Sequence, residues 1–137
     1  MDLRDTLHFQ HVHKAFDGTP VLRGLTARLP LGRITYVVGR SGQGKSVLCR
    51  LAVGLEQPDA GEILLAGQRV DTLSRTGRLA LRRQFPYLVQ SPALLDWLTL
   101  RENVALAAQQ GPGVDVDGAL ARVGVEGWAD ARPPDVS

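Results

Sequence analysis

This chain carries the stretch Gly39-Arg40-Ser41-Gly42-Gln43-Gly44-Lys45-Ser46, which fills the pattern G-x-x-x-x-G-K-[ST] at every fixed position. The pattern is typical of a loop whose backbone N–H groups surround phosphate, and glycines let the backbone approach the anion closely. We expect the Lys45 ammonium to contact the β- and γ-phosphates, and the Ser46 hydroxyl to coordinate Mg²⁺. The stretch therefore predicts a nucleoside triphosphate site.

The residues around the loop fit this interpretation. The run Arg33-Ile-Thr-Tyr-Val-Val38 predicts a buried strand entering the loop, and a helix is expected to begin at Lys45 and continue through Val47–Val53. A glycine-rich turn between strand and helix needs no ligand. However, only two of the sixteen basic residues are lysines, and one stands between Gly44 and Ser46. This placement favours the phosphate site.

Length and composition indicate a folded protein. With 137 residues, 44% hydrophobic and 22% charged, the chain is within the range of one domain. The net charge is only +2 and the basic residues are spread along the chain, which argues against nucleic-acid binding. No signal peptide or membrane-spanning run is found, which predicts a cytoplasmic protein. The single cysteine, Cys49, is expected to be buried in the helix after the loop.

The first part of the chain predicts a hairpin. Thr6–His13 alternates Leu7, Phe9 and His11 on one face, as in a half-buried strand, and Val21–Leu29 is expected to return beside it. The turn between them contains Phe16 to Pro20. Two more short strands are expected, at Glu62–Leu65 and Gln68–Val70.

The second part predicts mostly helices. Ser74–Gln84 is expected to be an amphipathic helix with Leu79 and Leu81 facing inward, followed by a strand at Tyr87–Gln90. The Thr99 and Glu102 side chains can form a capping box for a helix that runs to about Gln109. A shorter helix at Val116–Val123 and an irregular tail follow.

The order of these features resembles the nucleotide-binding subunit of ABC transporters over essentially the whole chain. The resemblance rests on the aromatic turn, the hairpin, the loop, and the segments Gly54-Leu55, Pro58–Ile63, Tyr87–Gln90 and Leu98–Val104. It implies an α/β P-loop NTPase fold, here truncated. Residues 1–90 would hold the antiparallel β subdomain and the first part of the P-loop core, and residues 91–137 part of the helical subdomain.

The resemblance also implies roles for particular residues. Phe16 would stack on the adenine ring of ATP, and Gln90 would contact Mg²⁺ and the attacking water. Without these roles, Phe16 would be a core residue of the hairpin and Gln90 a polar residue at the end of a strand. The implied ATP-binding set is Phe16, Gly39, Arg40, Ser41, Gly42, Gln43, Gly44, Lys45, Ser46 and Val47. Lys45 and Gln90 would be the catalytic residues, and Ser46 and Gln90 would hold Mg²⁺.

The partners implied are membrane permease subunits and a second ATP-binding cassette, most simply another copy of this chain. The coupling helix of the permease would dock on Ser91–Leu98, where Leu94, Leu95 and Trp97 look exposed, although these side chains can equally pack within the helical subdomain. This arrangement would place the protein peripherally on the cytoplasmic face of the inner membrane.

Several family motifs are not found in the sequence. Val136-Ser137 match only the beginning of the signature, and no apolar run ending in Asp-Glu and no switch histidine follows. We therefore expect very slow hydrolysis and poor solubility from residues 1–137 alone. The alternative to an ATPase subunit is a non-catalytic truncated remnant that at most binds nucleotide.

The cargo is indicated by two partial resemblances. Gly44–Leu48, Ala93–Asp96 and Leu98-Thr99 are similar to ATPases of bacterial phospholipid-trafficking transporters, with departures at Pro92 and Leu95. This resemblance favours phospholipid as the cargo. Leu94–Thr99 is also similar to nitrate, sulfonate and taurine importers. Two further alternatives are a soluble ABC protein acting in translation or DNA repair, and a small-molecule kinase, which explains neither Phe16 nor the stretch from Gln90 to Val104.

Overall fold

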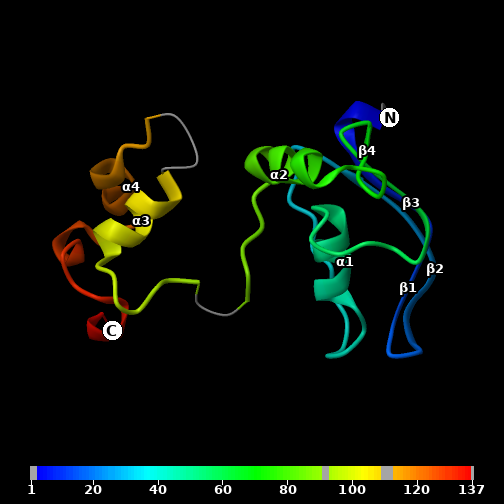
Figure 1. Ribbon diagram of the computed structural model, residues 1–137, viewed down its shortest axis with the longest axis horizontal. Helices are drawn as coiled ribbons and strands as arrows, with labels where there is room; N and C mark the ends of the chain where they lie inside the picture. Colours follow the sequence, from blue (N-terminus) through cyan, green and yellow to red (C-terminus); the bar gives the residue numbers. More distant parts are fainter. Residues whose placement is uncertain (1–2, 91–92, 109–112, 137) are drawn as a thin grey trace. The chain divides into compact units, whose positions relative to one another are not determined.

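The computed structural model describes residues 3–90, 93–108 and 113–136 and contains two compact units, Met1–Leu88 and Val89–Ser137 (Figure 1). None of the helices in these described ranges is long and apolar enough to cross a membrane.

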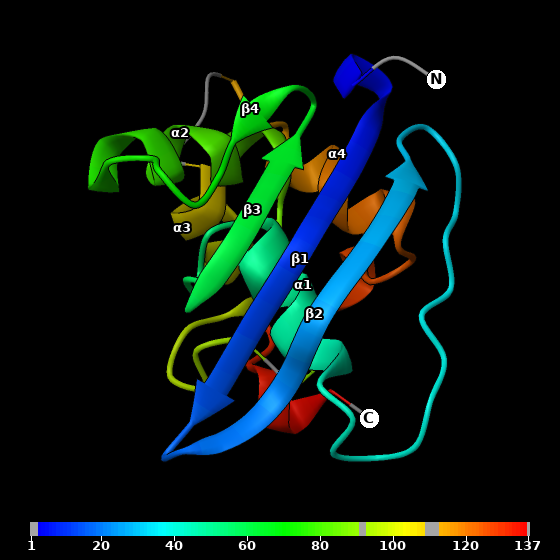
Figure 2. The ribbon, with the colours of Figure 1, turned by 90° about the vertical axis from the view of Figure 1, so that its right-hand side faces the viewer.

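The first unit is built on an antiparallel sheet with the strand order β2-β1-β3-β4 (Figure 2). The strands are β1 (Thr6–Phe16), β2 (Thr19–Pro30), β3 (Ala60–Leu65) and β4 (Gln68–Arg69). The predicted hairpin and the two predicted short strands are therefore confirmed. Asp17 and Gly18 form the tight turn of the hairpin with φ values of 49° and 76°, the left-handed region that such turns require.

A bulge in β1 changes which side chains reach the core. Phe9 pairs with Ala27 but Val12 pairs with Leu25, so β1 has one extra residue there. The extra residue is His11, with φ 49°. The predicted alternation through His11 is therefore wrong beyond Phe9, because the bulge turns His11 outward and places Val12 in the core.

Two helices complete the first unit. Helix α1 (Lys45–Ala52) covers one face of the sheet, and α2 (Arg75–Gln84) follows β4 (Figures 1 and 2). The largest fully buried side chains are those of Phe9, Leu51, Ile63, Val12, Val70 and Thr6. Apart from Thr6 these side chains are apolar, and burial stabilises each of the apolar ones by about 1.5–3 kcal/mol. This cluster therefore holds α1 against the sheet.

Helix α2 begins as expected but buries only one of its two predicted leucines. The Ser74 hydroxyl accepts a hydrogen bond from the Gly77 N–H at 3.2 Å and caps the helix. Leu81 is buried, whereas Leu79 is 45% exposed. Residues two positions apart on a helix point in directions about 200° apart. Leu79 and Leu81 therefore cannot both face the core.

Two predicted strands are absent from the described chain, and this corrects the sequence prediction. Residues 34–38 and 87–90 have no regular secondary structure, and no described strand pairs with either segment. Ile34 and Leu88 are 83% and 90% exposed. A strand is defined by its ladder of hydrogen bonds to a neighbour, so apolar β-prone residues alone do not make one.

Cys49 lies in α1 as predicted, but its predicted burial is wrong. It is a free, exposed cysteine on the outer side of α1. The neighbouring positions Val47 and Leu51 face the core instead, as the spacing of an amphipathic helix requires.

The second unit is helical, with α3 (Leu100–Ala108), α4 (Val116–Arg122) and the 3₁₀ turns η2 (Glu126–Trp128) and η3 (Pro133–Asp135). The predicted capping box is confirmed. The Glu102 N–H donates to Thr99 Oγ1 at 3.1 Å, and the Thr99 N–H donates to Glu102 Oε2 at 2.8 Å. The predicted helix end at Gln109 lies outside the described residues.

The core of the second unit is small. Leu100, Leu120 and Ala129 are buried together. Arg101 on α3 forms ion pairs with Asp117 on α4 and with Asp130, the latter at 3.1 Å. These exposed pairs contribute little individually, so the apolar cluster is what holds α3 and α4 together.

Candidate functional site

The glycine-rich loop turns sharply into α1. Gly44 is the residue before the helix and has φ 85°. A Cβ atom there would lie 2.7 Å from Val21 Cγ1 on β2. The left-handed backbone and the close contact with β2 both exclude a side chain at position 44. Glycine therefore lets the loop lie closer to the sheet than any residue with a Cβ atom could.

Lys45 is enclosed by the loop that it follows. Its Nζ donates hydrogen bonds to the carbonyl oxygens of Gly39 and Arg40, at 2.8 and 2.7 Å. The Arg40 N–H in turn donates to Gln43 Oε1 at 2.9 Å. The loop therefore curls around an ammonium group, and phosphate oxygens would offer that cation stronger, charged acceptors than the two carbonyls.

The rest of the predicted ATP-binding set divides by exposure. Arg40, Ser41, Gly42, Gln43 and Ser46 are exposed. The Val47 side chain is 7% exposed and packs in the core, so only its backbone is suited to contact a ligand. A cavity of about 160 Å³ beside the loop is lined mostly by Leu22, Leu25, Val37, Val38 and Leu48. It is too small and apolar for a nucleotide, so the outer surface of the loop is the candidate phosphate site.

Phe16 lies at the end of β1, and its ring is not part of the described core. It is 38% exposed. The Lys14 Nζ lies 5.1 Å from the centroid of its ring. The turn between β1 and β2 and the loop before α1 lie at the same end of the first unit (Figures 1 and 2). This arrangement leaves aromatic surface available at the end of the unit that carries the loop.

Lys14 is itself held by two carboxylates. Its Nζ lies 3.1 Å from Glu56 Oε1 and 3.2 Å from Asp59 Oδ1. Burial, the largest single influence, lowers the pKa of Lys14, but hydrogen bonds and charge from Glu56 and Asp59 outweigh it and leave that pKa raised. The Ala15 N–H and then Lys14 lower the pKa of Asp59. The raised pKa of Lys14 and the lowered pKa of Asp59 therefore favour the charged forms of these two side chains at neutral pH.

Sequence reasoning missed Lys14, Glu56 and Asp59. The available signal was that Lys14 stands two residues before Phe16, which puts both on one face of a strand. The two carboxylates come from the turn after α1 and lie about 40 residues away in the sequence, so only the fold brings them to Lys14.

Gln90 is exposed, lies in the second unit and belongs to none of the described strands. Ser46 lies in the first unit. The structure does not test whether the two share one Mg²⁺, and this stays a prediction.

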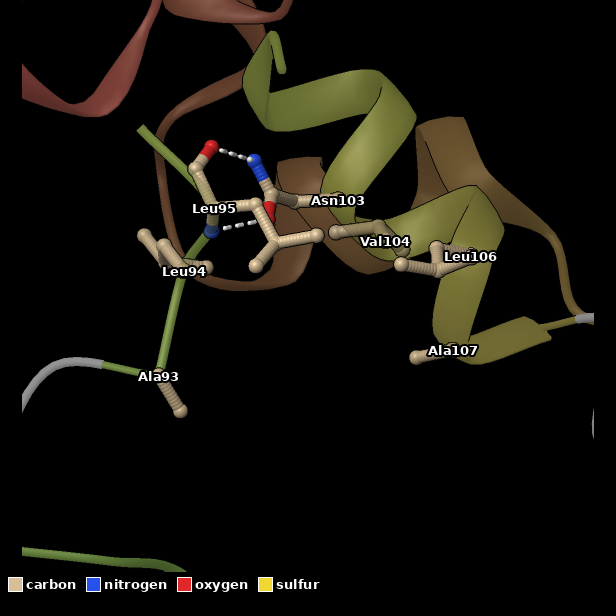
Figure 3. Close-up of a pocket in the computed structure, with 7 residues that line it drawn as sticks. All are labelled: Ala93, Leu94, Leu95, Asn103, Val104, Leu106 and Ala107. Carbon is tan, nitrogen blue, oxygen red and sulfur yellow. Dashed lines mark hydrogen bonds between the residues drawn. The ribbon is translucent and has the colours of Figure 1, made fainter. Parts of the chain in front are cut away.

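An apolar pocket lies in the second unit, where permease docking was predicted. Its volume is about 450 Å³, and it is lined by Ala93, Leu94, Leu95, Asn103, Val104, Leu106 and Ala107 (Figure 3). Leu94 is 47% exposed and Trp97 69%, so the predicted exposure of these two is confirmed. Leu95 is half-buried. The described part of the predicted docking segment therefore presents apolar surface.

Asn103 holds this segment in place. It is buried, and its Oδ1 accepts a hydrogen bond from the Leu95 N–H at 2.7 Å (Figure 3). Its Nδ2 is within hydrogen-bond distance of the carbonyl oxygens of Leu95, Leu98 and Thr99, at 3.1, 3.2 and 2.9 Å. One side chain thus satisfies several backbone groups of an irregular segment.

Replacing Asn103 by alanine is expected to release the segment. The variant loses a buried hydrogen-bonding side chain, which costs about 1–3 kcal/mol for backbone groups left without partners. Hydrogen exchange should show the Leu95 N–H exchanging at least about tenfold faster. Asn103→Asp retains the acceptor but places a carboxylate oxygen against the backbone carbonyl oxygens that Nδ2 contacts, so it should release the segment as well. Equal protection in wild type and Asn103→Ala would contradict the role assigned to Asn103.

Comparison with known proteins gives a consistent result. The family model described as "ABC transporter" matches residues 22–137. The cell division ATP-binding protein FtsE of Haemophilus influenzae is 37% identical over 139 residues, covering 96% of this chain and 64% of that protein. The aliphatic sulfonates import ATP-binding protein SsuB of Cupriavidus pinatubonensis is 38% identical, covering 96% and 41%. The methionine import ATP-binding protein MetN of Xanthomonas campestris is 36% identical, covering 96% and 42%.

A solved structure agrees on the fold. A dimeric ATP-binding cassette in a post-hydrolysis state, bound to ADP and Pi, superposes with a TM-score of 0.82 at 22% identity, over 96% of this chain and 63% of that chain. The P-loop NTPase fold predicted from sequence is therefore confirmed. This chain spans 64% or less of the length of the curated relatives described above.

Proposed function

The chain belongs to the ABC transporter family, and on this premise we propose that it is an ATP-binding subunit of a transporter that binds MgATP on the loop from Gly39 to Ser46. The observation that carries the proposal is the loop itself. It is curled around the Lys45 ammonium and continues directly into α1. Backbone N–H groups, a lysine and the positive end of a helix are together suited to a polyphosphate.

The roles proposed for the residues are those that the family resemblance implies. The loop backbone from Gly39 to Val47 binds the phosphates, Lys45 neutralises the β- and γ-phosphates, and the exposed Phe16 ring stacks on the adenine. Gln90 orients the attacking water. We also propose that residues 1–90 form the β subdomain with the first part of the P-loop core, and residues 91–137 part of the helical subdomain.

Mg²⁺ fits the proposed site as a companion of the nucleotide. The described residues include no cluster of three His, Cys, Asp or Glu side chains able to hold a metal alone. Mg²⁺ typically takes few protein ligands and completes its shell with phosphate and water. The exposed Ser46 hydroxyl, in the first turn of α1, is the ligand that this unit would supply, and bound Mg²⁺ would neutralise charge on the phosphates.

The proposed partners are a permease on the inner membrane and a second cassette. The permease contact is supported by the apolar segment with Leu94 and Trp97. A dimer is supported by the solved cassette with the same fold, which is dimeric. The relatives named above act in cell division, sulfonate import and methionine import. Their names give no support to phospholipid as cargo, whereas the alternative prediction of sulfonate-type import is represented among them.

Binding of MgATP tests the proposal directly. A fluorescent ATP analogue should bind saturably and be displaced by ATP, more tightly with Mg²⁺ than with a chelator. The ratio of the ATP affinity with Mg²⁺ to that with a chelator measures the advantage given by Mg²⁺. In Ser46→Ala we expect this ratio to shrink about tenfold, because the proposed protein ligand is lost. Ser41→Ala removes another exposed hydroxyl from the same loop and should retain the advantage. Absence of saturable binding by the wild-type protein would refute the proposed function.

A further inference from the structure

Lys14 lies at the centre of a compact cluster under the Phe16 ring. Its side chain is only 11% exposed, with Nζ 3.1 Å from Glu56 Oε1, 3.2 Å from Asp59 Oδ1 and 5.1 Å from the centroid of the ring. Lys14 and Phe16 are two residues apart on β1 and therefore project from the same face of the strand. A cation over an aromatic face is an attractive contact, so Lys14 restrains the orientation of the ring.

The carboxylates that hold Lys14 belong to the segment that follows α1. The N–H groups of Leu55 and Glu56 donate to the Arg50 carbonyl, at 2.9 and 3.3 Å, and tie this segment to the last turns of the helix. Further along, the Asp59 N–H donates to the His13 carbonyl at 2.9 Å, and Asp59 Oδ2 accepts from the Ala15 N–H at 2.6 Å. The segment is thus attached at one end to α1 and at the other to the end of β1.

These contacts make a continuous connection between the two proposed halves of the nucleotide site. The phosphate loop leads into α1, the end of α1 holds the Glu56–Asp59 segment, and that segment holds Lys14 and, through it, Phe16. A nucleotide has a limited span between base and phosphates. Fixing the ring relative to the loop before binding reduces the ordering cost of engaging both ends at once.

We propose that Lys14 is a positioning residue for base recognition, which holds the Phe16 ring at a fixed place relative to the phosphate loop through Glu56 and Asp59. The proposal rests on the proposed function, ATP binding, and adds the residue that sets how much of the affinity comes from the base. If Lys14 only stabilised the hairpin, its removal would affect ligands with and without a base alike.

The test compares MgATP with inorganic tripolyphosphate, which has the phosphates and no base. Displacement of the fluorescent analogue gives both affinities for wild type, Lys14→Ala and Lys14→Arg. We expect Lys14→Ala to weaken ATP binding about three- to tenfold and tripolyphosphate binding less than about twofold. Lys14→Arg keeps the cation and should therefore bind ATP nearly as tightly as wild type. Phe16→Ala removes the ring itself, so its selective loss of ATP affinity is the largest that this contact with the base can give.

A second variant protects the test against misfolding of Lys14→Ala. Glu56→Gln keeps the shape of the segment but removes one charge from the cluster, and it should weaken ATP binding in the same selective way, by less. If wild type binds ATP and these variants weaken both ligands equally, or neither, the inference about Lys14 is overturned while the proposed function stands. If wild type binds neither ligand, the proposed function fails first.

Discussion

Replacing Lys45 by alanine is expected to weaken MgATP binding at least about thirtyfold. Removing one partner of a hydrogen-bonded charge pair costs about 2–5 kcal/mol, and each 1.4 kcal/mol is about tenfold in affinity. Here the loss falls on the only lysine of the loop, and its Nζ also donates to the Gly39 and Arg40 carbonyls. The variant therefore loses a phosphate contact and the two bonds that close the loop.

The control for Lys45→Ala is Arg75→Ala, the same change of charge at the exposed first residue of α2. Helix α2 lies at the other end of the first unit from the loop (Figure 1), so nucleotide affinity should stay within about twofold of wild type. Far-ultraviolet circular dichroism without nucleotide checks that both variants fold. Unchanged ATP affinity in a folded Lys45→Ala protein would refute the assignment of the phosphate loop.

Replacing Gly61 by alanine is expected to cause the largest loss of stability. Gly61 is the second residue of β3 and lies beside the bulge of β1, with φ 89°. A Cβ atom there would overlap the His11 carbonyl oxygen and lie 2.6 Å from that of Gln10. The left-handed backbone costs an alanine about 1–2 kcal/mol, and overlap with fixed backbone about 1–3 kcal/mol more. We expect the free energy of unfolding to fall by about 2–5 kcal/mol, out of the 5–15 kcal/mol typical of a domain.

Gly18→Ala is the matched control for Gly61→Ala. Gly18 also has a left-handed backbone, with φ 76°, but nothing lies within 4 Å of the position of its Cβ. In Gly18→Ala the free energy of unfolding should therefore fall only by the cost of the left-handed backbone, about 1–2 kcal/mol. Urea unfolding followed by circular dichroism measures both variants. Equal losses would show that the close approach of β1 and β3 at Gly61 does not matter for stability.

Local sequence patterns correctly predicted features that depend on neighbouring residues. The turn that contains Asp17-Gly18 and the reciprocal Thr99–Glu102 cap are confirmed because their hydrogen bonds or backbone angles involve residues within a few positions. The P-loop pattern likewise predicted the loop that leads into α1. Its own glycines permit the close approach of the loop backbone to the sheet.

The sequence failed where the outcome depends on residues distant in the chain. Residues 34–38 have strand-forming side chains, yet Ile34 and Val38 are exposed, because no described strand supplies the second half of the hydrogen-bond ladder. The bulge at His11 was equally hidden, because it exists only in the pairing of β1 with β2 and β3.

The sequence by itself determined the fold family and the loop that is proposed to bind phosphate, because the spacing of Gly39, Gly44, Lys45 and Ser46 is a local requirement. Only the tertiary structure decided how Phe16 is held. The Lys14 ammonium meets Glu56 and Asp59 because β1 and the end of α1 are brought together by hydrogen bonds and core packing. Contacts across some 40 residues depend on the whole unit's packing, which no local pattern contains.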